Sequence, residues 1–183
     1  MEDKVLLKLA RMAILEEFEN KTLIDKNEWV EKYPFLKENR ASFVTLKKHG
    51  ALRGCIGSIL PHRPLIDDIV SNAKAAAFED PRFPPLRVEE FDEIKLEISL
   101  LTIPQKVEYE DKEGLMKKIR PGVDGVILQL ANHQATFLPS VWEELPVFEL
   151  FFAHLCMKAG LPGDCLMYHP VIYTYQAREI KED

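Results

Sequence analysis

Two short β-like segments lie close together in the first third of the chain, with a turn-forming stretch between them. In Ser42 to Leu46, Phe43 and Thr45 alternate with Val44 and Leu46. Lys48-His49-Gly50 supplies the turn, and the second segment follows at 52–57. Alternation with a period of two is typical of strands, and a short turn containing glycine joins antiparallel strands. The sequence therefore predicts an antiparallel hairpin here, which directs the chain toward folds whose sheets are antiparallel.

The rest of the chain continues this pattern of hairpins interspersed with helices. Further helices are predicted at 4–19, 25–33, 64–78, 112–119 and 148–159, and further strands at 95–102, 106–109, 125–130, 133–138 and 171–176. Helices that alternate with hairpins predict the α+β class, with antiparallel sheets flanked by helices. We see no internal repeat and no flexible interdomain linker.

Length and composition restrict the classes of protein to which this chain can belong. A chain of 183 residues has enough sequence for one well-packed domain with two lobes. A net charge of −6 argues against a large nucleic-acid footprint, because phosphate binding needs clustered Lys and Arg. No apolar run approaches the ~20 residues of a membrane span, and the charged N-terminus does not resemble a signal peptide.

The cysteines and histidines form no familiar ligand pattern. There are three cysteines, at 55, 156 and 165, without CxxC spacing, so a disulfide framework is predicted to be absent and a reducing cytoplasm fits best. Cys156 is expected to pack in the core and Cys165 to lie in a loop. No metal site and no nucleotide-cofactor motif is predicted.

The hexapeptide Leu52-Arg53-Gly54-Cys55-Ile56-Gly57 is the segment that points to chemistry. In a regular strand Arg53 and Cys55 share a face, and a guanidinium beside a thiol favours the reactive thiolate. Gly54 and Gly57 allow a bulge, or close approach by another backbone or by a ligand.

Several segments in the same order resemble the AMMECR domain family. The hexapeptide matches the signature of that family, and the resemblance extends to protein A of the AmmeMemoRadiSam system of bacteria and archaea. The other matching segments are Asn72-Ala73, Ala76-Ala77, Asp80-Pro81-Arg82-Phe83, Pro85-Leu86, Leu96 to Leu101, Asp124-Gly125-Val126, Phe137-Leu138-Pro139 and Lys158 to Pro162. The chain departs from the family pattern at two positions. After Leu138-Pro139 many members have Gln, whereas this chain has Ser140. Shortly after Lys158 to Leu161 many members have Trp, whereas this chain has Cys165.

The resemblance implies a single two-lobed domain with a cleft between the lobes, which the motif cysteine faces. The larger lobe is expected at about 1–103 plus 170–183 and the smaller at about 104–169. Strands near 43, 55, 98 and 173 are assigned to the larger lobe. The resemblance also implies Memo-like and radical-SAM proteins as partners.

Cys55 is the candidate nucleophile, and the alternative is a small buried residue of a central strand. A cysteine enzyme also needs a base. His62 is the nearest candidate along the chain and a weak one, and His133, His154 and His169 have no diagnostic spacing either.

Arg53 is a candidate for binding an anionic group, or else it forms an ion pair with Glu97, Asp80 or another acid. Asp80 and Arg82 are candidates for ligand binding, with a structural clamp in a proline-rich loop as the favoured alternative. The sequence thus leaves two functions open. One is a cleft enzyme or small-molecule modifier that uses Cys55, and the other is a non-catalytic binding or adaptor protein.

Overall fold

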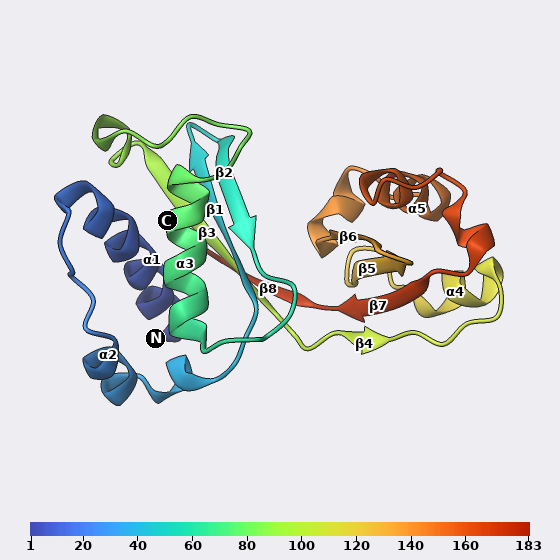
Figure 1. Ribbon diagram of the computed structural model, residues 1–183, viewed down its shortest axis with the longest axis horizontal. Coiled ribbons are helices and arrows are strands. Elements are labelled where there is room, and N and C mark those ends of the chain that lie inside the picture. Colours follow the sequence, from blue (N-terminus) through green and yellow to red (C-terminus); the bar gives the residue numbers. More distant parts are fainter. The chain divides into compact units, whose positions relative to one another are not determined.

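The structure is a computed structural model that describes residues 1–183. The helices are α1 (Glu2–Glu19), α2 (Lys26–Lys32), α3 (Leu65–Phe78), α4 (Lys112–Lys118) and α5 (Phe148–Lys158). The strands are β1 (Ser42–Lys48), β2 (Ala51–Gly57), β3 (Ile94–Leu101), β4 (Gln105–Lys106), β5 (Gly125–Leu130), β6 (His133–Phe137), β7 (Val171–Tyr175) and β8 (Ala177–Lys181). They form two antiparallel sheets with helices, so the predicted α+β class is confirmed (Figure 1).

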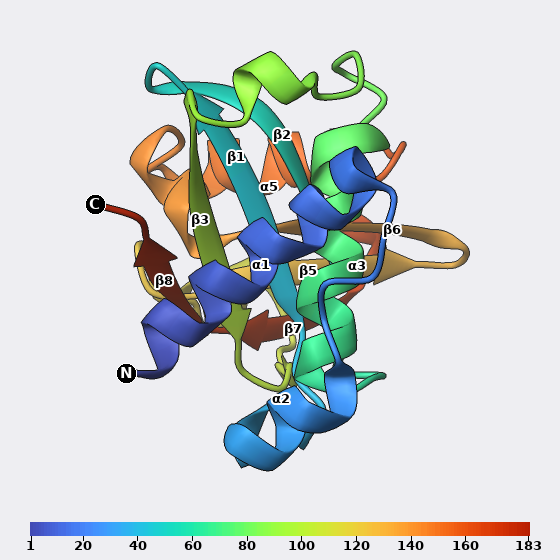
Figure 2. The same ribbon diagram turned by 90° about the vertical axis from the view of Figure 1, so that its left-hand side faces the viewer.

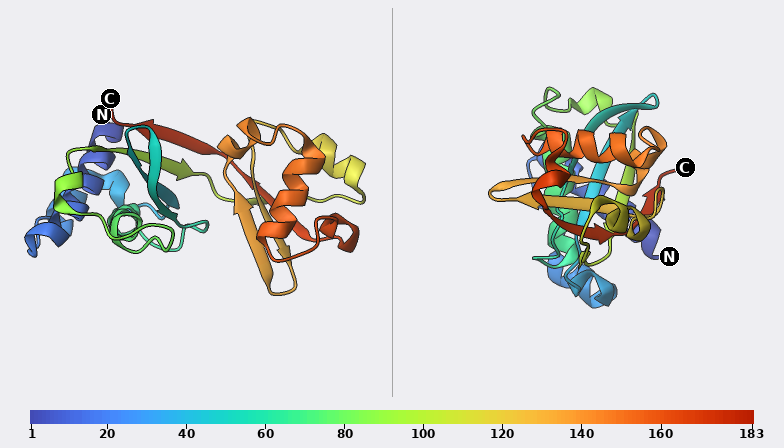
Figure 3. Two further views of the ribbon diagram at one scale, coloured as in Figure 1. Left: turned by 90° about the horizontal axis from the view of Figure 1, so that it is seen from above. Right: turned by 90° about the vertical axis from the view of Figure 1, so that its right-hand side faces the viewer.

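The chain divides into two compact units. Unit 1 comprises Met1–Leu101 and Arg178–Asp183, and unit 2 comprises Thr102–Ala177. Both ends of the chain belong to unit 1 (Figure 3). Each unit has its own sheet and its own hydrophobic core.

In unit 1 the strands follow the order β2-β1-β3-β8, and α1 and α3 lie over the same face of this sheet (Figures 1 and 2). The alternation in β1 explains which face is covered, because Val44 and Leu46 are fully buried while Phe43 and Thr45 are half-buried. Successive residues of a strand point to opposite faces. The side of the sheet that carries Phe43 and Thr45 is therefore the one that α1 and α3 leave uncovered, and we call it the open face.

Small residues let the two long helices approach each other and the sheet. Ala10 and Ala13 of α1, and Ala73, Ala76 and Ala77 of α3, are buried in the core of unit 1. Close packing of helices on a sheet excludes water from the apolar stripes predicted at the sequence level.

Unit 2 contains a sheet of order β4-β7-β5-β6, which α5 covers on one face (Figure 3). Val126 and Leu128 of β5 and Phe151 of α5 belong to one buried cluster. The indole of Trp142 stacks on Phe151, with ring centroids 3.6 Å apart.

The strand near 173 differs from its assignment to the larger lobe. β7 pairs with β5 in the second sheet, with Ile172 opposite Leu128 and Tyr173 opposite Ile127. After Gln176 the chain enters the first sheet as β8. The predicted last strand ended at 176 and corresponds to β7 alone, so β8 was not predicted from the sequence.

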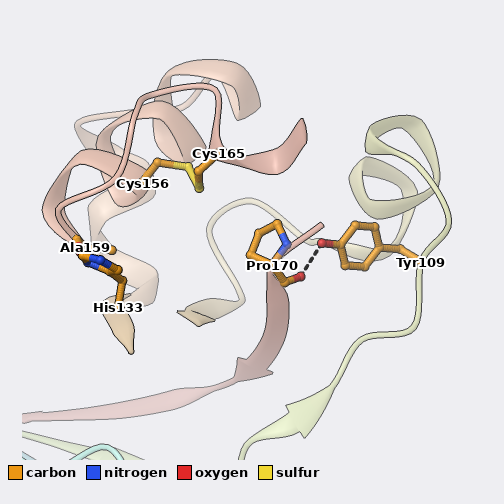
Figure 4. Close-up of a disulfide and its surroundings, with 6 residues drawn as sticks. All are labelled: Tyr109, His133, Cys156, Ala159, Cys165 and Pro170. Atoms are coloured by element: carbon orange, nitrogen blue, oxygen red, sulfur yellow. Dashed lines mark hydrogen bonds between the residues drawn. A yellow bond between two sulfur atoms is a disulfide. The ribbon is translucent and has the colours of Figure 1, made fainter. Parts of the chain in front are cut away.

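A disulfide joins Cys156 of α5 to Cys165, so the prediction of no disulfide was wrong (Figure 4). Both cysteines are fully buried in the core of unit 2, with Cα atoms 5.8 Å apart. The chain reverses after α5 at Gly160, which has φ +80°, and this turn brings the two cysteines together. Near by, the hydroxyl of Tyr109 donates a hydrogen bond to the carbonyl of Pro170.

Candidate functional site

The hexapeptide lies on β2, which is an edge strand of the first sheet. Leu46 of β1 is opposite Gly54, but the next residue, Lys47, is opposite Leu52. Arg53 is therefore the extra residue of a β-bulge, a device that redirects a side chain and interrupts the alternation of the strand. The expectation that Arg53 and Cys55 lie side by side assumed a regular strand, and the bulge at Arg53 breaks that regular alternation.

The side chain of Arg53 is buried against an acid that lies 37 residues further along the chain. Its Nε and one terminal nitrogen each donate to the carboxylate of Glu90 at 3.1 Å, and the same terminal nitrogen donates to the Pro84 carbonyl at 2.9 Å. These bonds lower the pKa of Glu90 to about 2. Arg53 thus forms an ion pair, as one alternative predicted, and Glu90 is the partner in place of Glu97 or Asp80. Its other terminal nitrogen is buried without a hydrogen-bond partner.

The space beside each of the two glycines of the motif is occupied by the protein's own atoms. A Cβ added at Gly54 would lie 2.1 Å from the carbonyl oxygen of Ala76, so Gly54 allows α3 to touch the strand. A Cβ added at Gly57 would lie 2.2 Å from the ring of Phe43. Both positions need glycine for packing.

Cys55 is on the open face of the sheet, because its neighbour Gly54 faces α3. Its side chain is half-buried and lies opposite Thr45, whose hydroxyl donates to the sulfur at 3.2 Å. The backbone N–H of Cys55 and its carbonyl both bond to the loop at 80–82 and not to β1. Such a non-hydrogen-bonded pair brings its side chains close together, which explains the Thr45–Cys55 contact.

The Asp80-Pro81-Arg82 loop closes the free edge of β2. Asp80 accepts the backbone N–H of Cys55 at 2.9 Å, and Arg82 donates to the Cys55 carbonyl at 3.4 Å. Arg82 also donates twice to Asp80, at 3.0 and 2.8 Å. Hydrogen bonds from Arg82 and from the Cys55 and Arg82 backbones hold the pKa of Asp80 well below its usual range, although burial acts in the opposite direction.

The guanidinium that interacts with Cys55 belongs to Arg82. Its pKa is raised, chiefly by hydrogen bonds to Asp80 and to a smaller extent by Coulombic attraction to Cys55. The side chain is 55% exposed, so it is also accessible to a solute. The ring of Phe83 lies within reach of both guanidinium groups, at 5.9 Å from Arg53 and 5.6 Å from Arg82.

His62, the weak candidate for a base, lies in an exposed loop. Its Nδ1 is 2.9 Å from the carbonyl of Leu60, which is a contact within that loop. The structure therefore brings Cys55, Asp80 and Arg82 together and records no contact between His62 and any of them.

A buried polar network beside this site was missed at the sequence level. Asp68 accepts hydrogen bonds from the hydroxyls of Ser42 and Ser58, at 2.5 and 2.8 Å, and from Arg63 at 2.8 Å. Asn72 donates to Asp68 at 3.1 Å. The available signal was the i, i+4 spacing of Asp68 and Asn72 beside the apolar stripe of α3. Since the acid is bonded on both oxygens, this network anchors the end of β2 to α3.

None of the helices combines the length and the hydrophobicity that a membrane-spanning helix needs.

Comparison with known proteins identifies the chain. The sequence matches the AMMECR1 family over residues 7–180. It is 41% identical to a protein of Methanothermobacter thermautotrophicus, over 100% of this chain and 95% of that one. It is 39% identical to protein TK0174 of Thermococcus kodakarensis, over 97% of this chain and 89% of that one. The crystal structure of the uncharacterized protein PH0010 from Pyrococcus horikoshii has a TM-score of 0.89 and 36% identity, covering 98% of this chain and 90% of that one. The chain therefore belongs to the AMMECR1 family.

Proposed function

We propose that the protein uses the thiol of Cys55 as a covalent acceptor for a small electrophilic group, such as an acyl or alkyl group. One observation carries this proposal. Within the motif Arg53 pairs with Glu90, and Gly54 and Gly57 pack against Ala76 and Phe43, whereas Cys55 is half-buried on the open face.

The surroundings of the sulfur suit a thiolate. The Thr45 hydroxyl donates to it at 3.2 Å, and the positive charge of Arg82 attracts it. A hydrogen-bond donor and a neighbouring cation both stabilise a thiolate, the nucleophilic form of cysteine. No general base beside the sulfur is then required, because the proton leaves to solvent before the reaction.

The reaction would proceed by displacement on an activated carbon. The thiolate sulfur forms a bond to the acyl or alkyl carbon. The bond from that carbon to its leaving group breaks, and the leaving group departs with the electron pair and takes a proton from water. Arg82 bonds to Asp80 through its Nε and one terminal nitrogen, and its other terminal nitrogen would hold a carboxylate or phosphate of the donor.

Alkylation by iodoacetamide tests this proposal, because Cys156 and Cys165 are held in the disulfide and leave one thiol in the non-reduced protein. We expect the rate at Cys55, followed by mass spectrometry, to reach its plateau below the ordinary thiol pKa of about 8.5. A rate that follows an ordinary thiol, or reaction only after unfolding, would contradict the proposal. Arg82→Ala is expected to move the profile to higher pH. Arg87→Ala, an exposed arginine outside the Cys55 contacts, is the matched control.

A second candidate function is the binding of partner proteins, and exposed apolar side chains in unit 2 favour it. Met157 is 53% exposed, Met167 78% and Tyr168 63%, around the end of α5 and the segment that follows the disulfide. Large exposed apolar side chains of this kind are available for contact with a partner protein.

The partners in this second case would be the Memo-like and radical-SAM proteins that the family resemblance implies. Pull-down with purified partners separates the two functions. Met167→Ser would weaken capture if the protein is an adaptor, and Cys55→Ser would leave capture unchanged. Loss of cellular function in a folded Cys55→Ser variant, with capture intact, would favour the covalent role.

A further inference from the structure

The two edge strands of the first sheet, β2 and β8, differ in what lies beside their backbones. At one edge, the Asp80–Arg82 loop bonds to the backbone of β2 and blocks further pairing. At the other edge lies β8, which ends the strand order next to β3 (Figure 2). A strand edge without a neighbour offers its N–H and C=O groups to another chain.

The backbone groups that face outward from β8 can be assigned. The N–H of Glu182 donates to the carbonyl of Leu96 in β3. Bonding groups alternate along a strand, so those of Ile180 also point toward β3. The groups of Glu179 and Lys181 therefore point away from the sheet, and both residues are exposed.

The charges along this edge follow the order Arg178, Glu179, Ile180, Lys181, Glu182. If a second copy of the strand lies antiparallel with Ile180 opposite its own counterpart, each charge meets its opposite. Glu179 then faces Lys181 of the other copy. Arg178 and Glu182, which form ion pairs with Asp3 and Arg11 within the chain, also lie opposite each other. Moving the two-fold axis by one residue places Glu179 opposite Glu179 or Lys181 opposite Lys181, and like charges directly opposite are destabilising.

This register also satisfies the backbone. Glu179 and Lys181 carry the outward-facing groups, so they would form the hydrogen-bonded pair of the new ladder. Ile180, whose groups face β3, would form the non-hydrogen-bonded pair on the two-fold axis. Hydrogen bonding is compatible with this arrangement, and charge selects it over the neighbouring registers.

We propose that β8 is a self-complementary edge at which two copies of this chain associate. The contact is isologous, with a two-fold axis through Ile180, and it joins the two four-stranded sheets into one. A groove of about 840 Å³ runs between α1 and β8. Half-buried Leu7, Met12 and Leu15 of α1 are among its lining residues, and the second copy would cover part of this apolar surface.

Glu179 and Lys181 form an ion pair of 3.5 Å within the strand, and charged side chains on an edge strand are a known protection against edge aggregation. Five paired residues bury less than a standard interface, so the dimer is expected to exchange rapidly with the monomer.

Sedimentation velocity of the full chain at increasing concentration tests the proposal through charge reversal. Wild type should dimerise reversibly. Glu179→Lys, which places a lysine opposite Lys181 of the other copy at both symmetric pairs, should raise the dimer Kd about tenfold or more. The double variant Glu179→Lys/Lys181→Glu restores opposite charges and should recover the wild-type Kd. Lys106→Glu, on the outer strand β4 of unit 2, is the control.

Amide hydrogen exchange identifies the edge. The N–H groups of Glu179 and Lys181 should become protected at high protein concentration, while that of Ile180 is protected at every concentration. A wild-type protein that stays monomeric at all concentrations would overturn the proposal. So would a dimer that Glu179→Lys leaves unchanged, or a folded double variant that fails to recover dimerisation.

Discussion

The carboxylate of Asp80 accepts a hydrogen bond from the backbone N–H of Cys55 at 2.9 Å. A side chain of the proline-rich loop thus supplies the acceptor that a neighbouring strand would otherwise supply to this edge strand. Arg82 completes the contact on the Cys55 carbonyl. The geometry of the candidate site therefore depends on the ion pair between the buried carboxylate of Asp80 and the half-exposed side chain of Arg82.

Removal of the Asp80 carboxylate should destabilise unit 1. Asp80→Ala leaves the Cys55 N–H without its acceptor and Arg82 without its ion pair, and the side chain of Asp80 is only 2% exposed. We expect a loss of about 2–4 kcal/mol in the free energy of unfolding, measured with urea. Asp92→Ala, at an exposed acid, should change it by less than about 0.5 kcal/mol.

Acid should weaken the fold through Asp80 and Glu90. Their pKa values are lowered in the folded protein, to about 2 for Glu90, so folding favours the ionised forms. This stability is fully present above the unfolded values of about 4, and it is lost as pH falls toward the folded values. Urea unfolding between pH 6 and about 2 should show a declining free energy that begins near pH 4.

A variant at Glu90 distinguishes the contribution of this carboxylate from acid unfolding caused by all other groups. Glu90→Gln cannot ionise, so part of the decline below about pH 4 should disappear, although the variant is less stable at neutral pH. Glu93→Gln is the matched control, since Glu93 contacts Lys48 at the surface. Identical pH profiles for wild type and Glu90→Gln would contradict the prediction.

Most elements of this fold, though not β8, could be predicted from the sequence because their signals are local. The apolar stripe of α3 follows the 3.6-residue period, and the hairpin of β1 and β2 follows the period of two. The partner of Arg53 could not be predicted, because Glu90 lies 37 residues away and the bulge that redirects Arg53 depends on the register with β1. Gly54 and Gly57 were correctly seen as places of close approach, but only the structure shows that Ala76 and Phe43 fill the space.

Gly54→Ala should be strongly destabilising. The added Cβ would lie 2.1 Å from the Ala76 carbonyl oxygen, which belongs to helix backbone and cannot rotate away. Overpacking of this kind costs about 1–3 kcal/mol or more, measured as a lower melting temperature of the variant. Gly163→Ala is the control, because its Cβ would meet Ala153 at an ordinary 3.7 Å. Equal melting temperatures for the two variants would show that α3 can move away from β2.

The disulfide was missed because an odd number of cysteines without CxxC spacing carries no pairing signal, and the proximity of Cys156 and Cys165 depends on the turn after α5. Its presence bears on the expected reducing cytoplasm, which stays a prediction. Both sulfur atoms are buried, so a reductant can reach them only when this part of unit 2 opens.

Reduction of Cys156–Cys165 should destabilise unit 2. The bond closes a loop across a sequence separation of 9, and a loop of this size restricts the unfolded chain by about 2–3 kcal/mol. Urea unfolding with and without dithiothreitol should show this difference. In a Trp29→Phe background, the fluorescence of Trp142, which stacks on Phe151, reports on unit 2. Cys156→Ala/Cys165→Ala should unfold at the reduced midpoint and lose its sensitivity to reductant, while Cys55→Ser should keep that sensitivity. Alkylation of three thiols in the native, non-reduced protein would contradict the bond itself.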